Sequence, residues 1–340
     1  MSLKCPYTTV FIDDFQPITI KHIQAIITAG KQNNHITFLV TNSFRPRTSK
    51  DPFTYEERFD MIVSTMDHIN ELNFNPLTRF FSIVPVQDCV YDKQSFITNI
   101  QAAVDKIDNF YKIELLMFHP EYLRMFPQWK GIASETLSWK DISSIKTDLY
   151  TGKNLTNILP YRISQTIKRL QEEQKEVFDA LVSEYNFITE YKAAWKFAPY
   201  TPTFVTADTV VIQSGHILMV ERGANPGKGL LALPGGFVNP TEFIEDAALR
   251  ELEEETKIDC PEKVLRGNIK DSKIFDYPLR SLRGRTITQA FYIELPDIGK
   301  LPKVKGSDDA TSATWIPLST LNPKQIFEDH FDIIQYFVNC

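Results

Sequence analysis

The sequence has few cysteines and no long apolar segment. Four cysteines occur in 340 residues: Cys5, Cys89, Cys260 and Cys340. They are too far apart for the paired spacing of a zinc site, and they indicate free thiols in a reducing compartment. No apolar run approaches the ~18–20 residues that span a bilayer, and the first residues lack the layout of a signal peptide. We therefore expect a cytoplasmic protein with no membrane partner.

An excess of basic residues is also absent. The chain has 37 Lys and Arg against 43 Asp and Glu, which gives a net charge of −6. A dominant nucleic-acid-binding surface is basic, so we expect no nucleic-acid partner. Internal repeats and low-complexity segments are lacking too, and the content of 43% hydrophobic residues is that of ordinary globular proteins. At ~100–200 residues per domain, the length predicts two domains; the oligomeric state is left open, with a homo-oligomer as one option.

The first part of the chain alternates between strand-like and helix-like segments. One helical segment ends near Gly30, and another begins near Thr54 with glutamates in its first turn. Four apolar runs have the composition of strands: residues 7–12, 36–42, 80–86 and 113–118. Strands that alternate with helices are typical of an α/β, doubly wound parallel sheet. Residues 1–154 are therefore predicted to form a Rossmann-like domain.

The pattern changes after residue 154. Residues 155–198 read as helix almost throughout, and we interpret them as a helical connector. From Thr203 two strand-like runs flank a Ser-Gly turn, which predicts a hairpin. Further strands are predicted at 286–294 and 312–316, and a final helix from Lys324 to Val338. Residues 199–340 are therefore predicted to form a second domain.

The strongest signal is an acidic helix that follows a glycine turn, in the segment GGFVNPTEFIEDAALRELEEETKI (235–258). Glu251, Glu254 and Glu255 have the spacing i, i+3 and i+4, which places them on one helical face. Like charges at this spacing repel one another, and a divalent cation would reverse that cost. Carboxylate oxygens suit Mg²⁺ or Mn²⁺, and Mg²⁺ usually also binds substrate phosphates. The alternative is an amphipathic helix whose glutamates are only solvated.

This segment resembles the Nudix box, G-x5-E-x7-R-E-U-x-E-E-x-G-U, where U is aliphatic. Lys257 replaces the last glycine, a position that serves the exit of the chain from the helix. The resemblance implies a C-terminal Nudix α/β/α sandwich that hydrolyses a nucleoside diphosphate linked to another group, with metal assistance. It also implies roles for the residues of the box: Gly235 through its carbonyl, Glu251, Glu254 and Glu255 as ligands of Mg²⁺ or Mn²⁺, and Gly236, Glu242 and Arg250 as structural residues, the last two as an internal pair.

The catalytic base varies within this family, so the box alone does not fix it. Glu251 is one candidate, and Asp308 and Asp309 in the loop GSDDA are the others. The alternative for this loop is a plain solvated turn.

A second loop, FDYPLRSLRGRTIT (275–288), contains Arg280, Arg283 and Arg285. Arginine binds phosphate through two parallel hydrogen bonds, so these three residues are candidates for substrate binding. The alternative is a solvated basic loop.

This loop, the lead-in FVTADTVVI, the run NPGKGLLALPGGF and the tail EDHFDII together resemble the Nudix half of bifunctional NMN adenylyltransferase/ADP-ribose pyrophosphatases. The resemblance covers about residues 197–340. It implies ADP-ribose as the substrate, cleaved to AMP and ribose 5-phosphate. Phe275 or Tyr277 are candidates for stacking on adenine, although core packing is the commoner use of such residues.

The same family has an N-terminal nucleotidyltransferase loop, G-R-F-Q-P-x-H-x-G-H. Here the run 13–22 reads DDFQPITIKH, so two aspartates replace the glycine and arginine, and Thr19 replaces the first histidine. Carboxylates at such a loop repel the phosphates of ATP, and a lost histidine removes a donor to the transferring phosphoryl group. By resemblance, the candidate residues of this nucleotide site are His22, Arg58, Arg124 and Lys146.

We therefore predict a Nudix ADP-ribose pyrophosphatase fused to an adenylyltransferase-like domain with a degenerate motif. One alternative is a bifunctional enzyme that also makes NAD from NMN and ATP. Another is a non-catalytic protein that senses ADP-ribose.

Overall fold

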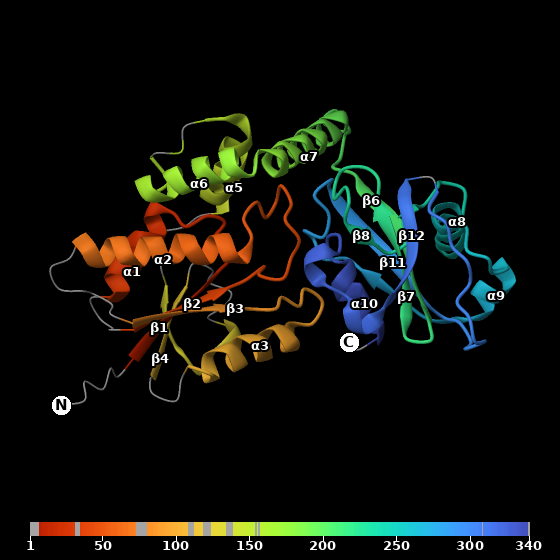
Figure 1. The fold of residues 1–340 in the computed structure, drawn as a ribbon, viewed down its shortest axis with the longest axis horizontal. Helices are drawn as coiled ribbons and strands as arrows, with labels where there is room; N and C mark the ends of the chain where they lie inside the picture. The colour runs from red at the N-terminus through yellow and green to blue at the C-terminus, as the bar shows by residue number, and fades with distance from the viewer. Residues whose placement is uncertain are drawn as a thin grey trace. The chain divides into compact units, whose positions relative to one another are not determined.

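The computed structural model describes residues 7–30, 35–72, 80–107, 112–117, 124–133, 139–153, 155, 157–307 and 309–338. The chain divides into two compact units, residues 1–182 and 183–340. Figure 1 colours them from red through yellow-green and from green to blue, respectively. Each unit contains its own sheet. Within the described ranges, no helix is both long and apolar enough to cross a membrane.

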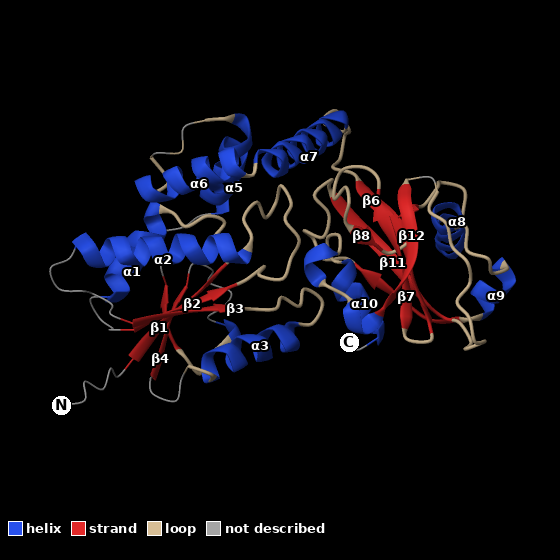
Figure 2. Ribbon diagram, in the orientation of Figure 1, coloured by secondary structure: helices blue, strands red, loops and turns tan. Residues whose placement is uncertain are grey.

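The first unit contains a parallel five-stranded sheet in the order β3-β2-β1-β4-β5. Every residue of β2 is buried, as expected for a strand covered on both faces. Helices α2 and α3 lie on opposite sides of this sheet (Figure 2). The strands are β1 (Tyr7–Asp13), β2 (His35–Val40), β3 (Phe80–Pro85), β4 (Lys112–Met117) and β5 (Lys130–Ala133). The helices are α1 (Ile20–Gly30), α2 (Tyr55–Leu72), α3 (Lys93–Asp105) and α5 (Trp139–Thr151).

Two further helices occupy most of residues 155–198, namely α6 (Tyr161–Glu173) and α7 (Lys175–Ala194). The division between the two units falls inside α7. The second half of α7 contributes to the C-terminal unit. The Glu184 carboxylate accepts a hydrogen bond from the Gly227 N–H at 2.8 Å, and Tyr191 packs edge-on against Phe204 with ring centroids 5.8 Å apart.

The second unit contains a mixed seven-stranded sheet with the path β10-β11-β6-β7-β12, to which β8 and β9 are added through β7 and β6. β11 and β6 are parallel, and the other pairs are antiparallel. The predicted hairpin and both predicted later strands are confirmed. The strands are β6 (Thr203–Gln213), β7 (His216–Arg222), β8 (Leu231–Ala232), β9 (Gly235–Phe237), β10 (Ile269–Phe275), β11 (Arg285–Glu294) and β12 (Ala310–Pro317).

Helices cover both faces of this sheet. Neighbouring residues of a strand point to opposite faces. On β11, Phe291 packs with Ala247 and Ala248 of α8, whereas Tyr292 stacks on Phe337 of α10 with ring centroids 5.7 Å apart. This is the predicted α/β/α sandwich. Its helical elements are α8 (Ile244–Thr256), α9 (Glu262–Gly267), α10 (His330–Val338) and the 3-10 turns η1 (Leu318–Thr320) and η2 (Pro323–Gln325).

The final helix is shorter than predicted. It begins at His330 rather than at Lys324, because Lys324 belongs to a 3-10 turn and Glu328 has a left-handed φ of +44°. A helix cannot run through a left-handed residue.

Candidate active site

The acidic helix α8 is preceded by a short strand, β9, that carries two glycines, and a loop joins the two. β9 is antiparallel to β6, and Gly235 lies opposite Asp208. A Cβ on Gly235 would lie 2.4 Å from the Ala207 carbonyl oxygen, and one on Gly236 would lie 2.6 Å from the carboxyl group of Glu251. At Gly235 the atoms in the way include backbone, so only glycine fits there, whereas a side chain at Gly236 would have to displace the Glu251 carboxylate.

Glu242 and Arg250 join the loop before α8 to the helix itself. Arg250 Nε donates to Glu242 Oε2 at 3.0 Å, and Nη2 donates to Oε1 at 2.7 Å. Arg250 Nη2 also donates to the Phe237 carbonyl at 3.3 Å. The hydrogen bonds from Arg250 hold the pKa of Glu242 down at about 2. The pair therefore fixes the position of the loop relative to β9 and α8.

The three glutamates of the box lie beside this pair. Arg250 Nη1 donates to Glu251 Oε1 and to Glu254 Oε2, each at 2.8 Å. Glu255 is buried, and its Oε2 accepts the Gly235 N–H at 3.0 Å. Burial raises the pKa of Glu255 to about 8, and the negative charges of Glu251 and Asp208 act in the same direction.

The donor set suits a hard divalent cation. Within the described ranges, no three Asp, Glu, His or Cys side chains converge as a metal site, and Glu251 and Glu254 turn towards Arg250 instead. The chemistry of the set still fits Mg²⁺ or Mn²⁺, because its donors are three carboxylates and the Gly235 carbonyl, all of them oxygen ligands. Glu255 is a buried carboxylate next to other carboxylates, and a cation would favour its ionised form.

Lys257 occupies the box position that is otherwise glycine. It ends α8 in a left-handed conformation with φ of +43°, and its N–H donates to the Glu253 carbonyl. The prediction that this position serves only the chain's exit agrees with that geometry. A left-handed non-glycine residue costs roughly 1–2 kcal/mol, partly offset by the greater entropy that glycine loses on folding.

We expect Lys257→Gly to raise the free energy of unfolding by about 0.5–1 kcal/mol, with no change in the metal ligands. Thermal unfolding of the two proteins at equal concentration measures the difference. A lower melting temperature for the glycine variant would contradict the left-handed geometry.

The three arginines of the segment 275–288 have different surroundings. Arg280 is 6% exposed, and its Nε and Nη2 donate to the two carboxylate oxygens of Asp329 at 2.8 and 3.0 Å. Arg285 Nη1 donates to the Asp276 carbonyl at 2.6 Å. The guanidinium of Arg283 lies over the Phe237 ring, 5.0 Å from its centroid. Substrate binding by Arg280 stays a prediction, and its Nε and Nη2 are engaged by Asp329.

Several polar residues behind the glycine turn were missed from the sequence. Asp208 accepts a hydrogen bond from the Thr288 hydroxyl, and its carboxylate lies 3.9 Å from Arg280. His330 Nδ1 accepts the Leu233 N–H at 2.9 Å. An aspartate within the apolar run TFVTADTVVIQ was the available signal, because a buried charge in a strand needs a partner.

The other candidates of the C-terminal half also have defined surroundings. Phe275 is fully buried against Tyr336 and Phe337, so it is a core residue and not an adenine platform. Tyr277 is half-buried. Asp309 is exposed, and its carbonyl accepts the Gly223 N–H at 3.0 Å. Asp308 lies outside the described residues.

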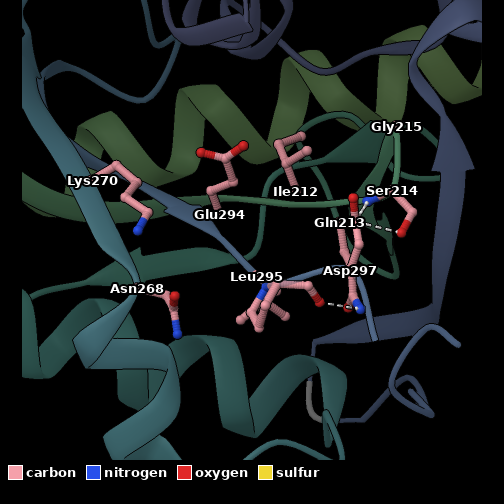
Figure 3. A pocket seen from close by; sticks show the side chains of 10 residues that line it. Ile212, Gln213, Ser214, Gly215, Asn268, Lys270, Glu294, Leu295 and Asp297 are labelled. Atoms are coloured by element: carbon pink, nitrogen blue, oxygen red, sulfur yellow. Dashed lines mark hydrogen bonds between the residues drawn. The ribbon is translucent and has the colours of Figure 1, made fainter. Parts of the chain in front are cut away.

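A separate hollow of about 340 Å³ lies at the opposite end of β6 from the glycine turn. Figure 3 shows Gln213, Ser214, Lys270, Glu294 and Asp297 around it. It contains none of the candidate residues of the box.

In the N-terminal unit, two of the residues expected to bind nucleotide, His22 and Arg58, are held by their neighbours. His22 is buried, and its Nδ1 accepts the Thr19 N–H at 2.9 Å. In the neutral tautomer the ring proton therefore lies on Nε2, which is 3.2 Å from Asp13 Oδ2. Asp13 and Thr19 are two of the residues that depart from the family's loop, and together they bind the surviving histidine.

Arg58 is also engaged internally. It is 1% exposed, and its guanidinium donates to the carbonyls of Asp14, Thr41 and Asn42 at 2.6, 2.8 and 3.0 Å. Nucleotide binding by Arg58 stays a prediction, and these three carbonyls accept hydrogen bonds from its guanidinium.

The remaining two candidates differ in exposure. Lys146 is half-buried, and its Nζ lies 3.9 Å from the Asp14 carboxylate. Arg124 is exposed. Burial raises the pKa of Asp14, Lys146 lowers it, and Asp13 and Asp51 raise it further. This loop is therefore rich in carboxylates, where a triphosphate site needs positive charge.

Comparisons with known proteins agree with this architecture. The NUDIX domain model matches residues 202–337. The chain is 36% identical over 143 residues to an ADP-ribose pyrophosphatase from Methanocaldococcus jannaschii, covering 42% of this chain and 78% of the relative. It is 25% identical over 182 residues to a nicotinamide/nicotinic acid mononucleotide adenylyltransferase from Acinetobacter baylyi, covering 52% of this chain and 92% of that protein.

A solved structure matches both units together. It is a bifunctional NMN adenylyltransferase/ADP ribose pyrophosphatase from Francisella tularensis, complexed with AMP and a manganese ion. The TM-score is 0.89 at 32% identity, and the match covers 98% of this chain and 99% of the other. The fold and the box thus define a Nudix domain fused to a nucleotidyltransferase-like domain. The chain belongs to the family of bifunctional NMN adenylyltransferase/ADP-ribose pyrophosphatases, and the predicted fold class and resemblance are confirmed.

Proposed function

We propose that the C-terminal domain hydrolyses ADP-ribose to AMP and ribose 5-phosphate with the help of Mg²⁺ or Mn²⁺. The observation that carries the proposal is the placement of Glu255, buried against the Gly235 N–H, beside Glu251 and Glu254 on one turn of α8. The similarity to an ADP-ribose pyrophosphatase supports the choice of substrate. The manganese ion in the solved relative supports the choice of metal.

Some residues of the box would bind the metal, and others orient the loop and the metal ligands. Glu251, Glu254 and Glu255, together with the Gly235 carbonyl, would hold the metal, which polarises the diphosphate and lowers the pKa of bound water. Arg250 fixes the loop through Glu242 and sets the starting positions of Glu251 and Glu254. Glu251 and Asp309 are the described candidates for taking the proton from the attacking water.

The test is incubation of the full chain with ADP-ribose and Mg²⁺ or Mn²⁺, followed by chromatography for AMP and ribose 5-phosphate. We expect both products in equal amounts, and none after the metal is removed with a chelator. Cleavage of other dinucleotides without cleavage of ADP-ribose would make the substrate assignment wrong. Tight binding of ADP-ribose without any hydrolysis in the presence of metal would favour the sensing alternative.

We further propose that the N-terminal unit does not make NAD. The His22 ring is bound by Asp13 and Thr19, and Arg58 is bound by main-chain carbonyls. Incubation of the chain with NMN, ATP and Mg²⁺ is expected to yield no NAD above the background of a protein-free control. Formation of NAD that is lost in His22→Ala would establish the bifunctional alternative instead.

A further inference from the structure

The loop before β11 contains an arginine, Arg283, whose Nε is buried without a hydrogen-bond partner among the described residues. We propose that Arg283 is a specificity-determining residue that binds one phosphate of the substrate's diphosphate, and that Glu328 is the residue that positions it. The inference rests on the proposed hydrolysis by the same domain. It separates Arg283 from Arg280 in the same loop and from Arg285 at the start of β11.

The three arginines differ in what their guanidinium groups bind. Arg280 uses Nε and Nη2 on the Asp329 carboxylate, and Arg285 donates to the Asp276 carbonyl. Arg283 Nε, in contrast, is buried and has no hydrogen-bond partner among the described residues. A buried N–H without a protein partner is rare, and it indicates a group that bonds to water or to a ligand.

Arg283 lies next to the glycine turn of the box. Its guanidinium covers Phe237, the residue that follows Gly235 and Gly236 in β9. The carbonyl of Phe237 accepts a hydrogen bond from Arg250, which also contacts Glu251 and Glu254. Arg283 and the acidic helix are therefore connected through one strand of three residues.

Arg222, at the end of β7, interacts electrostatically with both Arg283 and Glu255 of the acidic helix. Burial lowers the pKa of Arg222, and the nearby charge of Arg283 lowers it further, whereas Glu328 and Glu255 raise it. The guanidinium of Arg222 lies 4.1 Å from the Phe327 ring centroid, and its Nε donates to the Pro226 carbonyl at 2.8 Å. Arg283 is thus close to Arg222, whose pKa also responds to the charge of Glu255.

Glu328 approaches the arginine loop from the segment before α10. Its left-handed backbone turns the side chain so that Oε1 accepts the Leu282 N–H at 3.2 Å, one residue before Arg283. Burial raises the pKa of Glu328 to about 7, while Arg283 and Arg280 favour its ionised form. The neighbouring Asp329 binds Arg280, so both acidic residues hold the loop at successive points.

This arrangement has a consequence for substrate choice. A diphosphate has two phosphates to satisfy, and the cation held by the carboxylates attracts one side of it. A planar guanidinium on Phe237 presents a fork of donors to the other phosphate, which a lysine ammonium cannot reproduce. Arg283 would therefore favour nucleoside diphosphate compounds over monophosphate esters.

The experiment measures kcat and KM for ADP-ribose with Mn²⁺ on the full chain and five variants: Arg283→Met, Arg283→Lys, Glu328→Gln, the Arg283→Met/Glu328→Gln double variant, and Arg169→Met as a control. Arg169 is an exposed arginine on α6 whose substitution removes the same charge. We expect Arg283→Met to raise KM by about 10- to 100-fold with kcat nearly unchanged. Arg283→Lys should restore only part of the loss, and Arg169→Met should behave like the unmodified protein.

Glu328→Gln tests the positioning role through non-additivity. We expect it to raise KM by about 3- to 10-fold alone and to have no further effect in the Arg283→Met background. An unchanged KM in Arg283→Met would overturn the role of Arg283. An equal effect of Glu328→Gln in both backgrounds would overturn the role of Glu328.

Two further measurements separate these outcomes from other failures. Melting temperature and Mn²⁺ affinity should match the unmodified protein in each variant; should Glu328→Gln not fold, Glu328→Asp is used, and it should raise KM in the same direction. Should the unmodified chain hydrolyse no ADP-ribose, the proposed function fails, and equilibrium binding of ADP-ribose then tests Arg283 alone. Weaker binding by Arg283→Met supports its role, and equal binding overturns it.

Discussion

Replacing Glu255 with glutamine is expected to lower kcat/KM for ADP-ribose hydrolysis by about 10³-fold. The amide keeps an oxygen for the Gly235 N–H but loses the negative charge that a divalent cation requires. Glu254→Gln should have a similar effect for the same reason. Initial rates of AMP release at several Mn²⁺ concentrations measure both, and the Mn²⁺ affinity should fall in parallel.

Glu253→Gln is the matched control, because Glu253 is on the same helix but exposed. Its activity should equal that of the unmodified protein. The Glu255 variant should also be at least as stable without metal, since it removes a carboxylate whose ionisation is disfavoured by burial and by Glu251. Full activity in Glu255→Gln, or an equal loss in Glu253→Gln, would contradict the assignment of the metal ligands.

The second large effect is on stability. Arg58→Met is expected to lower the free energy of unfolding of the N-terminal unit by about 3–5 kcal/mol. The change leaves the carbonyls of Asp14, Thr41 and Asn42 without the guanidinium that joins them. Calorimetry of the full chain should show the loss in the thermal transition of that unit.

Arg162→Met serves as the comparison for this variant. Arg162 forms an exposed ion pair with Glu71 at 2.6 Å, so its loss should cost at most about 1 kcal/mol. A loss of less than about 1 kcal/mol in the free energy of unfolding for Arg58→Met would mean that the bonds from Arg58 to these carbonyls do not stabilise the fold. Nucleotide binding would then be the better explanation of this residue.

Features that depend on local spacing could be predicted from the sequence. Glu251, Glu254 and Glu255 share one helical turn, so the helix period alone brings them together. The pairing of Glu242 with Arg250 followed from the family motif. Four of the five strands of the first unit and four of the seven strands of the second followed from their apolar runs. The strands β5, β8, β9 and β10 were not predicted.

Features that depend on distant partners could not be predicted. The sequence does not distinguish Arg280, Arg283 and Arg285. In the structure, Asp329, which lies 49 residues from Arg280, binds the guanidinium of Arg280. Phe275 was predicted as a candidate for stacking on adenine, but Tyr336 and Phe337 of α10 cover its ring. The start of α10 was misplaced because the left-handed φ of Glu328 is not encoded by a glycine.

The position of α7 bears on how the C-terminal domain can be isolated. A shortened chain that starts at residue 199 would match the boundary expected from the sequence, yet it would lack Glu184 and Tyr191. The Gly227 N–H would lose its acceptor, and one side of Phe204 would be uncovered. An autonomous domain is expected to need the chain from Ser183 onwards, with the second half of the helix kept as part of its hydrophobic cover.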